Sequence, residues 1–115
     1  MITVYGIPNC NTMKKTFDWL KENKIDFQFH DYKKKGIDQA TLQAFIQQLG
    51  ENVVLNRQGA TYKQLSDDQK QLIGNSYELF RFLTEKTSAI KRPIIEKNGQ
   101  FQAGFDIEKL SQFLA

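Results

Sequence analysis

Apolar and polar positions in the N-terminal third of the chain predict a strand, a helix and a second strand. Residues 2–6 are β-branched or aromatic and end in glycine, which is typical of a short strand. Residues 13–20 have helical spacing, with Phe17, Trp19 and Leu20 as the expected buried side chains. Residues 25–32 alternate apolar Ile25, Phe27 and Phe29 with polar Asp26, Gln28 and His30. Because His30 falls on the polar side, we interpret it as a surface or structural residue. The pattern predicts a right-handed βαβ unit with parallel strands.

The middle of the chain has the spacing of several helices. Their expected starts are Asp38, Ser66, and Asn75 or Ser76. Ile37 and Leu42 fit a hydrophobic staple around the first start, and Gly50 is a natural end of that helix. Gln69 follows Ser66 by three positions, as in a capping box. We therefore expect a helical block.

The C-terminal section returns to strands. Residues 93–97 and 100–103 flank Asn98-Gly99, a strong signal for a hairpin turn. Asp106 is the expected cap of a last helix. The side chains expected to point inward from this helix are Ile107, Leu110, Phe113 and Leu114. The predicted order is β-α-β, a helical block, β-β and α.

This α/β order is that of the thioredoxin fold with an all-helical insertion between its two halves. The insertion is expected at about residues 36–90, packed against the sheet, within a single domain of residues 1–115. The chain has 115 residues, 40% of them hydrophobic and 25% charged, which is enough for one globular core. No apolar run approaches the roughly 18 residues of a membrane span, and no signal peptide is evident.

Charge and cysteine content exclude several classes of function. The net charge of +3 is dispersed apart from Lys33-Lys34-Lys35, and no nucleic-acid-binding motif is present, so we expect no direct nucleic-acid binding. One cysteine and one histidine rule out a cysteine-rich zinc site or a histidine cluster, so no metal is expected. A lone cysteine forms no internal disulfide, which fits a reducing cytoplasm. We also expect a monomer.

The lone cysteine, Cys10, falls in the turn before the first helix. Free backbone N–H groups and the helix dipole at this position favour a thiolate over a thiol. Lys14 and Lys15 add positive charge, and Asn11 and Thr12 are expected to help bind an anion. The alternative is a small buried hydrophobic side chain with an inert thiol. The residues around Cys10 leave both interpretations open.

Four segments resemble, in order, the arsenate reductase-like (ArsC/Spx) family. They are Gly6–Lys15, Phe29–Tyr32, Leu55–Gly59 and Ile90–Ile94. The resemblance extends essentially from end to end and is strongest to the YffB-type branch of small thiol reductases.

The resemblance implies a role for each matching position. It makes Cys10 the nucleophile, Arg57 and Arg92 the holders of a substrate oxyanion, and Pro93 a cis-proline opposite the cysteine. Guanidinium groups suit this task because they donate two parallel hydrogen bonds to an oxyanion. The alternatives are a surface role for Arg57, a strand-end role for Arg92 and an ordinary strand-start role for Pro93.

Three positions depart from the family's pattern. Arsenate reductases carry a histidine at the position of Gly6 and a third arginine near Gly104, and regulatory members carry a second cysteine where this chain has Met13. The resemblance therefore implies an arsenate reductase-like protein that does not use arsenate as its physiological substrate. An internal disulfide switch is chemically impossible with one cysteine.

We therefore expect a thiol-dependent reductase that acts through Cys10 on a small oxyanion or a disulfide. Glutathione, or a dithiol protein such as glutaredoxin, would supply the resolving thiol, and no bound cofactor is expected. One alternative is a non-catalytic Spx-like regulator that binds RNA polymerase or another partner. A second alternative is a protein that binds small anions or glutathione without turnover.

Overall fold

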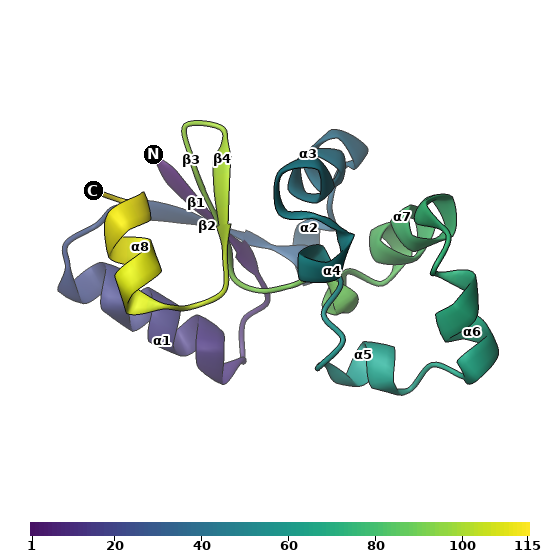
Figure 1. The fold of residues 1–115 in the computed structure, drawn as a ribbon. Coiled ribbons are helices and arrows are strands. Elements are labelled where there is room, and N and C mark those ends of the chain that lie inside the picture. Colours follow the sequence, from purple (N-terminus) through teal and green to yellow (C-terminus); the bar gives the residue numbers. More distant parts are fainter.

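The computed structural model describes all 115 residues and contains a four-stranded sheet between two layers of helices (Figure 1). The strands are β1 (Ile2–Gly6), β2 (Phe27–Asp31), β3 (Ile94–Lys97) and β4 (Gln100–Ala103). Their order is β2-β1-β3-β4, with β1 and β2 parallel and the other two pairs antiparallel. The predicted βαβ unit and C-terminal hairpin are both confirmed.

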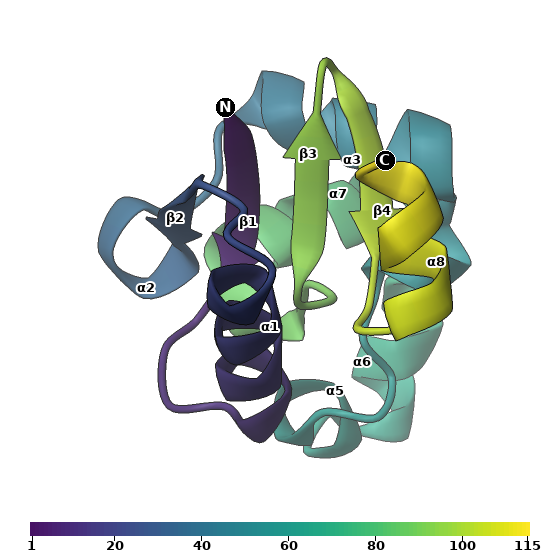
Figure 2. The same ribbon diagram turned by 90° about the vertical axis from the view of Figure 1, so that its left-hand side faces the viewer.

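Two helices cover one face of the sheet. They are α1 (Asn11–Glu22) and α8 (Ile107–Phe113), which both lie in front of the sheet in Figure 2. A cluster of fully or almost fully buried side chains joins these helices to the sheet: Val4, Met13, Leu20, Ile95 and Leu110. Burial of such side chains contributes about 1.5–3 kcal/mol each. This layer fixes the start of α1, and with it Cys10, against the ends of the strands.

The helical block covers the other face. Its helices are α2 (Tyr32–Lys35), α3 (Gln39–Leu49), α4 (Glu51–Val54), α5 (Ala60–Lys63), α6 (Asp67–Leu72), α7 (Ser76–Glu85) and the 3-10 turn η1 (Thr87–Ala89). A second, larger core that includes Phe45, Leu83 and Ile94 joins the block to the sheet. The block lengthens the molecule, as Figure 1 shows. The extents of the molecule along its principal axes are 45 × 26 × 25 Å.

The block is closed where it leaves and rejoins the sheet. A single β-bridge pairs Leu55 with Ile90. Next to it, the Asn56 N–H donates to the carbonyl oxygen of Ala89 and the Lys91 N–H donates to that of Val54, both at 2.8 Å. These bonds fix the segment that leads to Arg92 and Pro93.

The predicted helix caps are confirmed. Asp38 accepts a hydrogen bond from the Thr41 N–H at 2.7 Å, and Ser66 and Gln69 form a complete capping box. Asn75, rather than Ser76, caps α7. Asp106 caps α8.

Some boundaries and one buried position differ from the prediction. The first helix begins at Asn11 and not at residue 13, and β2 ends at Asp31 because that side chain caps α2. Ile107 was expected to point inward, which is wrong, since 54% of it is exposed. The core contact of α8 begins one turn later, at the fully buried Leu110. No helix is long and apolar enough to cross a membrane.

Candidate active site

Cys10 is the N-cap residue of α1. Its backbone is extended, and its carbonyl oxygen accepts the first helical hydrogen bond, from the Lys14 N–H at 2.9 Å. Asn9, just before it, has a positive φ of 56°, a conformation that asparagine tolerates better than most residues. This turn places the Cys10 side chain, which is partly exposed, among the free N–H groups of the first helical turn.

The surroundings of Cys10 favour its ionised form. Burial of the thiol opposes ionisation, but the Met13 N–H, the Arg92 side chain and the Thr12 N–H together outweigh it and lower the pKa of Cys10. The positive charge of Arg92 adds to the same effect. These are the physical conditions that make a cysteine nucleophilic near neutral pH.

Arg92 is held next to this thiol by the end of the helical block. Its Nη1 donates to the carbonyl oxygen of Ser88 at 2.8 Å, while its Nε is buried and has no hydrogen-bond partner. Buried N–H groups are usually paired, so Nε is a donor that a thiolate or a bound anion can use. The peptide bond from Arg92 to the buried Pro93 is cis.

Met13 and Gly6 form a wall of the site. A Cβ atom placed on Gly6 would lie 2.5 Å from the Met13 sulfur and 3.5 Å from Cβ of Arg92. Met13 is 1% exposed, so its thioether fills the space that a side chain at position 6 would need. This packing leaves an apolar surface beside Cys10. It is formed at the two positions, 6 and 13, where the family's pattern has a histidine or a second cysteine.

A groove of about 520 Å³ opens at Cys10 and follows α1. Its lining residues are Pro8, Asn9, Cys10, Asn11, Met13, Lys14, Phe17, Asp18 and Lys21. Two of the expected residues, Asn11 and Lys14, therefore lie in the groove with Cys10. Thr12 contributes its N–H group, and Lys15 is exposed and does not line the groove.

Arg57 lies elsewhere. It lines a separate pocket of about 380 Å³ together with Lys91, and its guanidinium is 5.9 Å from the centre of the Tyr62 ring. The expected residues are therefore divided between two places: Cys10, Arg92, Asn11 and Lys14 together, and Arg57 with Lys91.

His30 has a structural position. Its Nε2 lies 2.7 Å from the carbonyl oxygen of Gly36, and the centre of its ring lies 5.0 Å from the centre of the Tyr5 ring.

Sequence reasoning missed three residues that shape the site: Met13 as a wall, Ser88 as the anchor of Arg92, and Lys91. A basic pair was visible at positions 91 and 92, but nothing in the sequence showed that its two side chains separate. Nowhere do three His, Cys, Asp or Glu side chains form a group suited to a metal ion.

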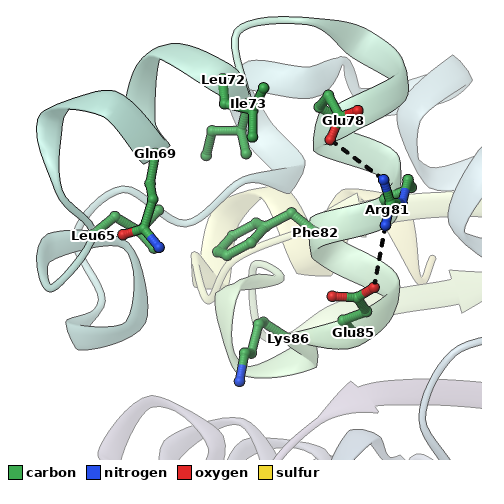
Figure 3. Close-up of a pocket in the computed structure, with 9 residues that line it drawn as sticks. All are labelled: Leu65, Gln69, Leu72, Ile73, Glu78, Arg81, Phe82, Glu85 and Lys86. Atoms are coloured by element: carbon green, nitrogen blue, oxygen red, sulfur yellow. Dashed lines mark ion pairs between the residues drawn. The ribbon is translucent and has the colours of Figure 1, made fainter.

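A further hollow of about 370 Å³ lies on the helical block between α6 and α7 (Figure 3). Phe82 points into it, and Arg81 on its rim forms ion pairs with Glu78 and Glu85. No cysteine lines this hollow, so Cys10 remains the candidate nucleophile.

The fold and the position of its one cysteine at the start of α1 define a thioredoxin-like protein with a single free thiol. The ArsC family profile matches residues 5–113, and the chain belongs to this family. It is 38% identical to an uncharacterized protein of Haemophilus influenzae, over 92% of each chain. The solved structure of a YffB protein is similar over 100% of both chains, with a TM-score of 0.93 and 36% identity. A global transcriptional regulator Spx of Lactiplantibacillus plantarum is 27% identical over 99% of this chain and 86% of its own.

Proposed function

We propose that this protein is a monothiol reductase that uses Cys10 as its nucleophile and glutathione, or a dithiol protein such as glutaredoxin, as the source of the resolving thiol. The observation that supports this most is the position of Cys10 as the cap of α1 with Arg92 beside it, which lowers the pKa of the thiol. The chain has no second cysteine, so the resolving sulfur has to come from another molecule.

The proposed reaction on a mixed disulfide has two exchange steps. The Cys10 thiolate attacks the glutathione sulfur of a substrate R–S–S–glutathione, the old S–S bond breaks, and the substrate leaves as a thiolate that takes a proton from water. A second glutathione thiolate then attacks the glutathione sulfur on Cys10. This releases glutathione disulfide and restores the Cys10 thiolate, so that the net reaction converts R–S–S–glutathione and one free glutathione into R–SH and glutathione disulfide.

The chain's own residues support each step. The Met13 and Thr12 N–H groups and Arg92 stabilise the thiolate both as attacking group and as leaving group. The Met13 side chain keeps one side of the sulfur apolar. The groove along α1 leaves room for a substrate or glutathione chain.

An oxyanion such as arsenate fits this site less well than a disulfide. Only Arg92 of the two expected arginines lies with Cys10, and Met13 fills the space next to Gly6. We therefore place arsenate among the substrates that this protein does not use.

Steady-state turnover tests the proposal. The wild-type protein and Cys10→Ser are supplied with a glutathionylated peptide and glutathione, and glutathione disulfide is followed with a coupled reductase. We expect turnover that saturates with the peptide and is lost in Cys10→Ser. No turnover above the uncatalysed rate by the wild-type protein, with glutathione or with glutaredoxin, would refute the enzyme; binding of glutathione without turnover would favour a binding protein.

A second candidate function is a non-catalytic regulator that docks on RNA polymerase or another protein. It is favoured by the end-to-end similarity to an Spx regulator and by the hollow on the helical block. Retention of polymerase subunits by Cys10→Ser from a cell extract would support it. If Phe82→Glu abolishes this retention and Lys109→Gln does not, the docking surface lies at the hollow.

A further inference from the structure

The pocket shared by Arg57 and Lys91 has the composition of an anion site. It has a volume of about 380 Å³, and its polar lining consists of Arg57, Lys91, Asn52, Asn56 and Gln58, with no carboxylate. The ion pairs of the protein all involve Arg81, so neither Arg57 nor Lys91 has an acidic partner. Two cations and three amide side chains around one hollow favour a negatively charged ligand.

The position of Lys91 is set by the surrounding structure. Its N–H donates to the Val54 carbonyl oxygen at 2.8 Å, and its own carbonyl oxygen is approached by the Tyr32 hydroxyl at 3.5 Å. A Cβ atom placed on Gly104 would lie 3.8 Å from Cε of Lys91, which shows that the lysine stem passes over this glycine. The Lys91 side chain is therefore half-buried, and these contacts set the position of its ammonium group.

The pocket adjoins the site of chemistry through two consecutive residues. Arg92 extends to Cys10, whereas Lys91 extends to Arg57, and neighbouring Cα atoms are about 3.8 Å apart. In Figures 1 and 2, the start of α1 and the segment from α4 to α5 both lie toward the lower side of the molecule. A substrate with its sulfur at Cys10 can therefore extend toward this pocket.

We propose that Lys91 and Arg57 form a subsite for a negatively charged group of the substrate, separate from its reacting sulfur. This inference rests on the proposed function and adds a substrate class to it: disulfide compounds that carry a carboxylate or a similar anion on a short chain. Arg57 then recognises the remote end of the substrate and does not stabilise the reacting atoms.

Matched disulfide probes test the subsite without a reductant. The probes are 3,3′-dithiodipropionate and 6,6′-dithiodihexanoate, each compared with its neutral diamide, and the readout is the second-order rate of Cys10 mixed-disulfide formation by intact mass. In the wild-type protein we expect at least one of the two carboxylate probes to react about tenfold faster than its own diamide, equivalent to about 1.4 kcal/mol. Lys91→Gln and Arg57→Gln should each reduce this preference to about threefold or less.

Lys109→Gln is the matched control, because it removes one positive charge from the exposed face of α8 and should keep the tenfold preference.

Equal rates for carboxylate and amide in the wild-type protein would overturn the subsite while leaving the nucleophile intact. An equal loss of both rates in Lys91→Gln would overturn it in favour of a positioning effect on Arg92. Inorganic phosphate should remove only the carboxylate's advantage; if it changes both rates equally, the anion is not part of the substrate. Failure of every probe to react would instead refute the proposed function.

Discussion

Arg92 lies beside Cys10 and is anchored there by the carbonyl oxygen of Ser88. The two residues come from opposite ends of the chain, and the folded sheet brings the segment before β3 next to the start of α1. The arginine charge and the free N–H groups of the helix therefore act on the same sulfur atom.

Replacement of Arg92 by glutamine should raise the pKa of Cys10. The substitution removes both the hydrogen-bonding group and the positive charge that stabilise the thiolate. The measurement is a pH titration of the ultraviolet absorbance of the thiolate. Arg81→Gln is the control, since Arg81 pairs with Glu78 and Glu85 on the helical block and should leave the titration unchanged. An unchanged midpoint in Arg92→Gln would contradict the assignment of Arg92 to the thiol.

The Cys10 thiolate should make the stability of the protein depend on pH. A pKa that is lower in the folded than in the unfolded state contributes stability above the unfolded value of about 8.5. This contribution decreases as the pH falls and is lost below the folded pKa. The free energy of unfolding of the wild-type protein, minus that of Cys10→Ser, should therefore rise with pH in urea titrations under reducing conditions. A difference that is constant or falls with pH would show that the fold does not favour the thiolate.

Gly6 and Met13 should be energetically coupled. Gly6→Ala places a methyl group against the buried Met13 thioether and should destabilise the protein by about 1–3 kcal/mol, as overpacking does. In a double-mutant cycle with Met13→Ala, the added methyl group should find space, so the cost of Gly6→Ala should be smaller. Thermal or urea unfolding of the four proteins measures this coupling, and strictly additive losses would mean that the two positions do not compete for space.

Asp38 should stabilise α3 through its cap. Asp38→Ala removes the acceptor for the Thr41 N–H and should cost about 1 kcal/mol, whereas Asp38→Ser should retain most of the stability. The Thr41 N–H, the Thr41 side chain and the charge of His30 together lower the pKa of Asp38 against a small opposing effect of burial. The stability that Asp38 contributes is therefore present above the ordinary carboxyl pKa of about 3.9 and lost as the pH falls through the lower folded value. Equal stability of the alanine and serine variants at neutral pH would contradict the cap.

The sequence predicted the elements whose signals are local. The Asp38 cap, the Ser66–Gln69 capping box and the Asn98-Gly99 hairpin each depend on a few consecutive residues, and the structure has all three. Helix α5 was not predicted, since Ala60–Lys63 is a single turn with no side-chain cap. The exposure of Ile107 also could not be predicted, because it depends on where the short helix α8 meets the sheet.

The candidate site was predictable only in its centre. A turn before a helix indicated the position of Cys10, and the resemblance indicated Arg92. The division of Lys91 and Arg92 between two pockets follows from the bridge between Leu55 and Ile90, which joins residues far apart in the chain. The filling of the space over Gly6 by Met13 likewise depends on how α1 packs against the sheet.

The most direct test of the central claim follows the mass of the intact protein through one cycle. Reduced protein is mixed with glutathione disulfide near neutral pH, and free glutathione is then added in excess. The account predicts a single glutathione adduct on Cys10 that forms at a pH below the ordinary thiol pKa, is lost when glutathione is added, and is absent from Cys10→Ser. A wild-type protein that forms no adduct, or one whose adduct persists under excess glutathione and glutaredoxin, would contradict a reductase that acts through Cys10.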